Sequence, residues 1–80
     1  MVDILYTNKF EKEIKKLDSS IKSKVIKQIE KIIQNPKIGK PLRYDLRGEK
    51  TIYVKPYRII YSFNQKSIIF LRVKHRKFVY

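Results

Sequence analysis

The sequence predicts an α+β domain in which a two-helix hairpin covers one face of a small, twisted, mostly antiparallel sheet, in the order β-α-α-β-β-β. The 80 residues are enough for one domain, which we take as 1–80. Apolar residues recur at helical spacing over 8–34, whereas β-branched and aromatic runs separated by turn residues fill 50–76. Helices and strands segregated along a chain in this way are typical of α+β architectures.

The first strand and first helix are predicted at the N-terminus. VDILYT (2–7) alternates in the manner of a short strand, with every second side chain on one face: Val2, Ile4 and Tyr6. Asn8 and Glu11 have the spacing of a capping box, so we expect a helix that begins at Asn8 and covers 8–17. Its apolar side chains follow at helical spacing: Phe10, Ile14 and Leu17.

The second helix is expected to follow at once. Asp18-Ser19-Ser20 reads as a turn and as the next N-cap. Asn35-Pro36 ends the helix, because the residue before a proline avoids the helical region. Between these signals one apolar stripe runs to about Gln34: Ile21, Val25, Ile26, Ile29, Ile32 and Ile33.

The remaining chain predicts a loop and three strands. Residues 36–48 hold two prolines and both glycines, which indicates a loop with a short edge strand near 42–46. The strands are expected over 50–55, 57–63 and 67–76, with Pro56 at the first connection and Asn64-Gln65-Lys66 as a hairpin turn. The alternative is one long helix over 57–73, against which the β-branched and aromatic content argues.

The positive charge is concentrated in the second half of the chain. The formal net charge is +13, of which residues 1–36 contribute +3 and residues 37–80 contribute +10 together with all five arginines. Arginine binds phosphate in a bidentate manner, so this half is expected to carry an anion-binding surface on the sheet face left open by the helices. The alternative is that the charge serves general solubility.

Several kinds of function are excluded or disfavoured. There is no cysteine, so disulfides, cysteine-based zinc sites and a cysteine nucleophile are absent. The seven carboxylates and one histidine form no metal-ligand pattern, and no glycine-rich phosphate loop is present. No signal peptide and no membrane span is recognised, so we expect a cytoplasmic protein without metal or cofactor.

The residue types that remain suit metal-independent cleavage of RNA. The 2′-hydroxyl of RNA can attack the adjacent phosphate, provided that the protein orients the ribose, stabilises the extra negative charge and moves protons. Arginine suits the charge stabilisation because it stays protonated and forks onto phosphate oxygens. Histidine, lysine or tyrosine can serve as the acid or base when neighbouring cations displace the pKa.

The cations fall at defined places on the predicted strands. Arg58 opens its strand, and pairing through the hairpin turn places it near the level of 72–74, so that Arg58 and Arg76 can converge at one end of the sheet. Strict alternation places three cations on one face of the last strand (Arg72, Lys74 and Arg76) and four residues on the other (Ile69, Leu71, Val73 and His75). Alternatives stay open: a salt bridge from Arg58 to Asp45 or Glu49, and purely structural roles for Arg72 and His75.

Two stretches resemble the RelE/ParE superfamily of toxins from type II toxin–antitoxin systems, in its RelE-like branch. VKPYRIIYSF (54–63) is similar to the VGDYRVIY-like stretch of many members, and HRKFVY (75–80) is similar to their HRxxVY-like ending. The short first strand, the helix hairpin ending at Asn35-Pro36 and LRG (46–48) extend the resemblance to nearly the whole chain.

The resemblance implies a microbial-RNase-like fold and a toxin that enters the ribosomal A site and cuts mRNA there. It also implies a small antitoxin that wraps around the toxin and holds it inactive, and we expect this antitoxin to be acidic. Arg58 and Arg76 then resemble phosphate-stabilising arginines, and Tyr80 resembles a terminal tyrosine that orients the base or assists proton transfer. The other residues expected to bind RNA are Arg47, Lys50, Tyr53, Lys55, Lys74, His75 and Lys77.

The chain departs from the RelE pattern in two ways. RelE-type enzymes commonly carry two basic residues on the strand before the YR strand, where this sequence has Thr51 and Tyr53. The general base is therefore open between Lys50, Lys55, His75 and Tyr80, and the further alternative is that this protein cleaves RNA poorly. The α-carboxylate of Tyr80 would also lie beside the site. A ParE-like gyrase inhibitor without RNase activity and a generic basic RNA-binding module are the alternative functions.

Overall fold

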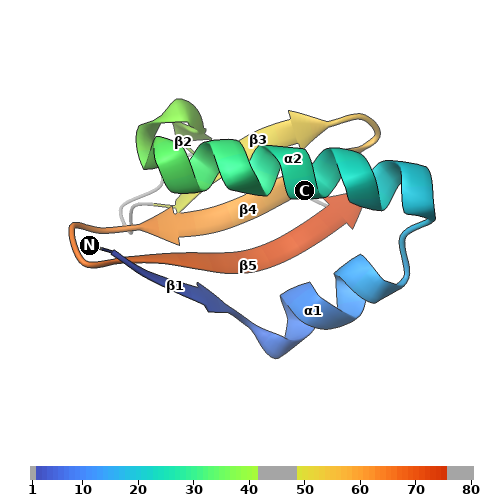
Figure 1. Cartoon of the computed structure of the whole chain (residues 1–80), viewed down its shortest axis with the longest axis horizontal. Helices are drawn as coiled ribbons and strands as arrows, with labels where there is room; N and C mark the ends of the chain where they lie inside the picture. Colours follow the sequence, from blue (N-terminus) through green and yellow to red (C-terminus); the bar gives the residue numbers. More distant parts are fainter. Residues whose placement is uncertain (1, 42–48, 76–80) are drawn as a thin grey trace.

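A mixed sheet with two helices on one side forms the protein (Figure 1). The computed structural model describes residues 2–41 and 49–75. Within these, the strand order is β1-β5-β4-β3-β2. The elements in chain order are β1 (Asp3–Tyr6), α1 (Asn8–Lys15), α2 (Ser19–Gln34), the 3-10 helix η1 (Pro36–Ile38), β2 (Lys40–Pro41), β3 (Glu49–Val54), β4 (Tyr57–Phe63) and β5 (Ser67–His75).

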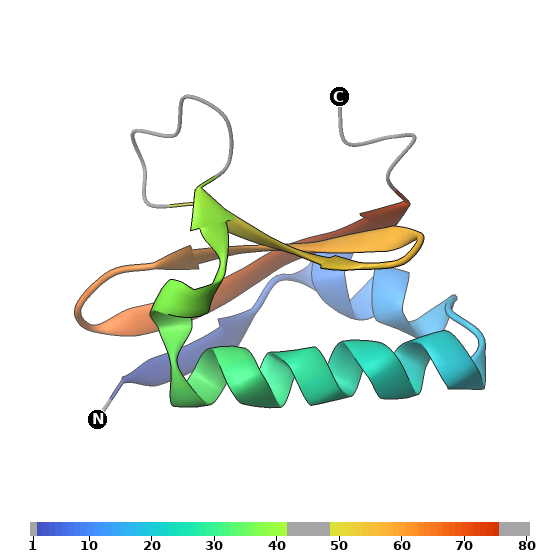
Figure 2. The ribbon, with the colours of Figure 1, turned by 90° about the horizontal axis from the view of Figure 1, so that it is seen from above.

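The predicted α+β class and its mostly antiparallel sheet are confirmed. β5 pairs in parallel with β1 and antiparallel with β4, and β3 pairs antiparallel with both β4 and β2. Figure 2 shows α1 and α2 on the same side of the sheet, which leaves the opposite face without a described helix. The β4–β5 hairpin forms at the expected turn, where Asn64 Oδ1 accepts hydrogen bonds from the backbone N–H groups of Lys66 (2.7 Å) and Ser67 (2.9 Å).

Both helices begin where predicted, at Asn8 and after Asp18, but the N-cap of the first was predicted wrongly and that helix ends at Lys15 rather than at 17. Asp18 caps α2, since its Oδ1 accepts from the Ile21 N–H at 2.9 Å. Thr7, rather than Asn8, caps α1: its hydroxyl oxygen accepts from the Phe10 N–H at 3.1 Å and donates to the Leu71 carbonyl at 2.8 Å. The tertiary bond to Leu71 decides between two adjacent residues that are both good N-caps.

The expected edge strand near 42–46 lies outside the described residues. What the structure describes is β2, two residues that pair with Lys50 and Thr51 of β3. The strand predicted over 50–55 runs Glu49–Val54, and the one predicted over 57–63 has those bounds.

The core lies between the sheet and the helices. Phe10 from α1 and three residues of α2 (Val25, Ile29 and Ile32) pack against one face of the strands. The buried side chains of that face are Val54, Ile59, Tyr61, Ile68, Phe70 and Val73. This explains the one-sided apolar pattern of both helices, because their buried positions recur at helical spacing.

Tyr61 is a fully buried polar anchor within this core. Its hydroxyl donates to the Pro36 carbonyl at 2.7 Å and accepts from the Gly39 N–H at 3.0 Å, and burial raises its pKa. A Cβ on Gly39 would overlap the Tyr61 hydroxyl, so glycine is required here for close approach. Tyr61 thereby fixes the chain between α2 and β2 against the sheet.

Tyr61→Phe is expected to lower the free energy of unfolding by about 1–3 kcal/mol, because it leaves a buried donor and a buried acceptor without partners. Urea denaturation measures this. Tyr6→Phe is the matched control: the Tyr6 hydroxyl makes no hydrogen bond with any described residue, and the side chain is 44% exposed. Equal midpoints for the Tyr61→Phe and Tyr6→Phe variants would contradict the anchor role.

Candidate RNA-binding site

A β-bulge in β5 determines which cations reach the open face of the sheet. Opposite β4, Ile60 pairs with Arg72 whereas Tyr61 pairs with Phe70, so Leu71 is an extra residue on β5. Strict alternation of this strand was therefore predicted wrongly: Val73 and His75 share the helix-covered face with Phe70, not with Ile69 and Leu71. The bulge re-aims the strand end, so that the grouping of Arg72 with Lys74 on the open face holds.

Groups from the N-terminal part of the chain satisfy the backbone of β5 beyond the end of β1. The Thr7 N–H donates to the Phe70 carbonyl at 3.1 Å, and the Thr7 hydroxyl bonds the Leu71 carbonyl. The Glu13 carboxylate accepts from the Val73 N–H at 2.9 Å. Since buried backbone groups need partners, these contacts hold the bulged end of β5 in place.

Glu13 also anchors Arg72. Arg72 Nε donates to the two Glu13 oxygens at 3.0 and 3.1 Å, and Arg72 Nη2 forms an ion pair with the same carboxylate. Burial alone would raise the pKa of Glu13, but the hydrogen bonds from Arg72 and from the Val73 N–H outweigh it and lower the pKa below its ordinary value. Arg72 is therefore a structural residue, one of the alternatives that the sequence left open.

We expect Glu13→Gln to lower the free energy of unfolding by about 1–3 kcal/mol at pH 7, because charged hydrogen bonds are lost. A lowered carboxylate pKa stabilises the fold above the unfolded-state value, and that contribution is lost as pH falls through the folded-state value. The difference between wild type and variant should therefore shrink at pH 3 in urea titrations. Glu11→Gln, at an exposed position of the same helix, is the control. A pH-independent difference would refute the carboxylate role.

Arg58 lies at the centre of a cationic and aromatic cluster on the open face. It pairs across the sheet with Tyr53 on β3 and with Lys74 on β5, as expected from the hairpin. The Arg58 guanidinium carbon lies 5.6 Å from the centroid of the Tyr53 ring, within cation–π range. Thr51 shares this face through its pairing with Ile60. The pattern brings together Arg58, Tyr53 and Lys74 from three strands.

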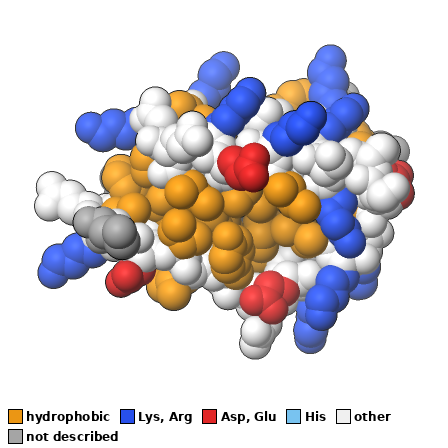
Figure 3. Space-filling view, in the orientation of Figure 1, with side chains coloured by type: hydrophobic (Ala, Val, Ile, Leu, Met, Phe, Trp, Pro, Cys, Tyr) orange, Lys and Arg blue, Asp and Glu red, His pale blue; other side chains and the backbone are white. Residues whose placement is uncertain are grey.

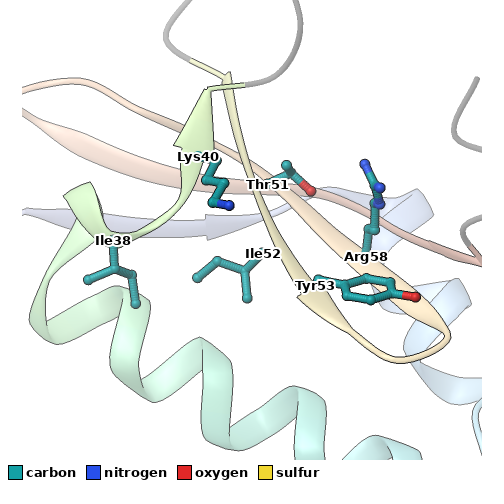
Figure 4. Close-up of a pocket in the computed structure, with 6 residues that line it drawn as sticks. All are labelled: Ile38, Lys40, Thr51, Ile52, Tyr53 and Arg58. Carbon is teal, nitrogen blue, oxygen red and sulfur yellow. The ribbon is translucent and has the colours of Figure 1, made fainter.

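A cavity of about 350 Å³ adjoins this cluster along the outer edge of β3 (Figure 4). Of its six lining residues, only Tyr53 and Arg58 were predicted from the sequence as site residues. Lys40 is brought to Thr51 by the two-residue strand β2, and a pairing so short, in a segment rich in proline and glycine, leaves no periodic pattern to detect. The other lining residues are Ile38, Thr51 and Ile52.

Two predicted RNA-binding residues lie on the other face. Lys50 pairs with the buried Tyr61, and His75 pairs with Tyr57 in an edge-to-face ring contact with centroids 5.4 Å apart. Both therefore point to the helix side, where a separate cavity of about 520 Å³ is lined by His75 and Tyr57 and also by Lys74 at its rim. Lys55 stands in the turn between β3 and β4. Arg47, Arg76, Lys77 and Tyr80 lie outside the described residues.

No cluster of three or more potential metal-binding side chains occurs within residues 2–41 and 49–75. Among the helices in that part of the chain, none is long and apolar enough to cross a membrane. Arginine, lysine and tyrosine side chains share the open face (Arg58, Lys74 and Tyr53), and residues of these types can bind phosphates and stack on bases.

The fold and the site define a small cationic α+β protein that presents Arg58, Lys74 and Tyr53 on the sheet face opposite its helices. The family model for the ParE toxin of type II toxin–antitoxin systems, parDE, matches residues 4–80. The chain therefore belongs to this family, within the RelE/ParE superfamily, and is a toxin of a type II toxin–antitoxin system. The resemblance noted in the sequence is confirmed. No curated protein sequence matches the chain.

Solved structures agree with this assignment. The chain is similar to the toxin–antitoxin complex RelBE2 from Mycobacterium tuberculosis, with 26% identity, TM-score 0.78, and coverage of 94% of this chain and 98% of that one. The RelB–RelE antitoxin–toxin complex from Methanococcus jannaschii shows 29% identity, TM-score 0.75 and 91% coverage of both chains. The intact Escherichia coli RelBE complex has the same fold, with 18% identity, TM-score 0.80, and coverage of 94% and 96%.

Proposed function

We propose that this toxin is a ribosome-dependent, metal-independent mRNA endoribonuclease that inhibits translation in the cytoplasm. The observation that carries the proposal is the position of Arg58, on the open face between Tyr53 and Lys74. In the reaction, the ribose 2′-hydroxyl attacks the adjacent phosphorus, the P–O5′ bond breaks, and the products are a 2′,3′-cyclic phosphate and a 5′-hydroxyl. Arg58 stabilises the negative charge that accumulates on the phosphate oxygens in the transition state.

Lys74 adds positive charge to the same region. It is the cross-strand neighbour of Arg58, and its charge also acts on Glu13, where it lowers the carboxylate pKa. Two cations opposite each other on one face repel, and a bound phosphate relieves that repulsion. Arg76 is proposed as a second phosphate arginine, and Tyr80 as the group that orients the base.

The proposed partner is a cognate antitoxin, as in the RelB-containing complexes of the similar structures. Figure 3 shows hydrophobic side chains gathered in a band across the helix side of the molecule. Among the described residues, large hydrophobic side chains are exposed on β1 (Tyr6, 44%) and on α2 (Ile26, 46%). An amphipathic antitoxin segment would cover such a band, and an acidic one would complement the surplus of +10 in residues 37–80.

A second candidate is favoured by the family model, which is that of ParE toxins: inhibition of DNA gyrase without RNA cleavage. A translation extract programmed with a defined mRNA separates the two. We expect the toxin to produce cuts within the A-site codon, mapped by primer extension, and to leave plasmid supercoiling by gyrase unchanged. Inhibited supercoiling with intact mRNA would establish the second candidate instead.

A further inference from the structure

The cavity at the edge of β3 has the composition of a nucleotide site rather than of a purely ionic one. Ile38 and Ile52 give it apolar surface, and Tyr53 adds an aromatic ring that is 41% exposed. Its volume of about 350 Å³ is at the lower end of the range typical of small-molecule sites. An apolar and aromatic lining of this kind accommodates a flat, weakly polar group such as a nucleobase. A phosphate alone is neither flat nor weakly polar.

Cations stand on two sides of this cavity. Figure 4 shows Lys40 and Arg58 on opposite sides of Thr51, with Arg58 close to the Tyr53 ring. The two cations come from different strands, β2 and β4, so their spacing is set by the sheet and not by one flexible segment. A nucleotide within a single strand has this arrangement of charge, because its base is flanked by a phosphate on each side.

Tyr53 occupies one of the two places at which RelE-type enzymes commonly carry a basic residue. A basic residue there would add charge, whereas a phenol ring adds a surface on which a base can stack. Stacking of bases on aromatic side chains is strong and tolerant of sequence, since every base has a π-face. The cation–π contact with Arg58, at 5.6 Å, holds ring and guanidinium together as one platform.

We propose that Tyr53 is a base-stacking residue in a subsite for single-stranded RNA that follows the edge of β3, between phosphate contacts at Lys40 and Arg58. The proposal rests on the proposed function for the class of ligand, but not on cleavage. The subsite positions a nucleotide beside the arginine that holds the scissile phosphate.

A single-tryptophan reporter tests this directly, because the chain contains no tryptophan. Tyr53→Trp keeps an aromatic platform and is titrated with a 2′-O-methyl RNA hexamer, which cannot be cleaved. We expect its fluorescence to be quenched by the hexamer but not by an abasic hexamer of equal charge. Ile26→Trp, at a position 46% exposed on α2, is the control and should not respond.

Affinities measured for the same hexamer separate stacking from charge. Tyr53→Ala should weaken binding about 5- to 100-fold with an unchanged salt slope, and Tyr53→Phe should bind within about 2-fold of wild type. If the alanine variant folds poorly, Tyr53→Leu replaces it, because leucine also lacks an aromatic ring but fills more of the space of the tyrosine side chain. Arg58→Ala, in contrast, should reduce the salt slope by about one.

The subsite would be refuted if the Tyr53→Ala variant bound the hexamer with wild-type affinity, or if the fluorescence of the Tyr53→Trp variant did not respond to the hexamer. It would also be refuted if a hexaglutamate peptide quenched that fluorescence equally, because the cavity would then be a protein-binding site. Loss of the proposed function is distinguishable from these results. Intact mRNA on ribosomes together with a quenched reporter would refute the endoribonuclease and leave the RNA subsite standing.

Discussion

Replacing Arg58 by alanine is expected to lower the rate of mRNA cleavage on ribosomes by a factor of about 10²–10³, the cost typical of removing one group that stabilises a developing oxyanion. Arg58 is half-buried on β4 and is flanked across the sheet by Tyr53 and Lys74. It is thus held by regular structure rather than by a loop. Single-turnover cleavage of a ribosome-bound mRNA at saturating toxin measures the chemical step.

Two further variants serve as controls for the Arg58→Ala result. Lys66→Ala removes one exposed positive charge in the β4–β5 turn, at the far end of β4 from Arg58, and should leave cleavage within about 2-fold if net charge is not the cause. Arg58→Lys keeps the charge but loses the bidentate fork, and should fall between wild type and alanine. Equal cleavage by the wild-type and Arg58→Ala proteins, both folded, would remove Arg58 from the mechanism.

Phe70→Ala is expected to have the largest effect on stability, about 3–5 kcal/mol. Phe70 is fully buried on β5, and its ring lies among three others, with centroid distances of 5.2 Å to Tyr6, 5.4 Å to Phe10 and 6.0 Å to Tyr61. A chain of 80 residues has about 4–12 kcal/mol of stability in total. The truncation therefore removes a large share of what holds β1, α1 and β4 around β5.

Urea denaturation followed by circular dichroism measures the loss. Phe70→Leu keeps an apolar group of similar bulk and should cost less than about 1.5 kcal/mol. Tyr53→Ala, which truncates an aromatic residue that is 41% exposed on the open face, should change stability by about 0.5 kcal/mol or less. If Phe70→Ala lowered the free energy of unfolding no more than Tyr53→Ala does, the core described around β5 would be incorrect.

The sequence was informative where local pattern and tertiary packing agree. The stripe from Ile21 to Ile33, closed by Asn35-Pro36, predicted α2 to its last residue because the buried positions of a helix repeat at its own period. The run 57–63 predicted β4 with its observed bounds, since β-branched and aromatic residues fill it and turn residues flank it. β4 also carries Arg58, so the position of this residue in the sheet was predictable.

What the sequence did not predict depends on contacts between distant segments. The choice of Thr7 over Asn8 as N-cap follows from the Leu71 carbonyl, 64 residues away. The bulge at Leu71 inserts one residue into a run that otherwise alternates, and contacts from Thr7 and Glu13 accompany it. Lys40 reaches the site only through the pairing of β2 with β3.

The same bulge shows why a single inserted residue matters for function. Without it, a strand that buries Ile68 and Phe70 would also bury the positions of Arg72 and Lys74. With it, Val73 enters the core and Lys74 faces Arg58 across the strands. The cationic pair on the open face is therefore a consequence of one irregularity in β5.

The most direct test of the central claim, cleavage driven by the RNA's own 2′-hydroxyl, uses an mRNA with one 2′-deoxy nucleotide at the cleaved position of the A-site codon. We expect a cut in the all-ribose mRNA that leaves a 2′,3′-cyclic phosphate and a 5′-hydroxyl, and no cut in the 2′-deoxy mRNA. Cleavage of the 2′-deoxy mRNA, or a product with a 5′-phosphate, would contradict it.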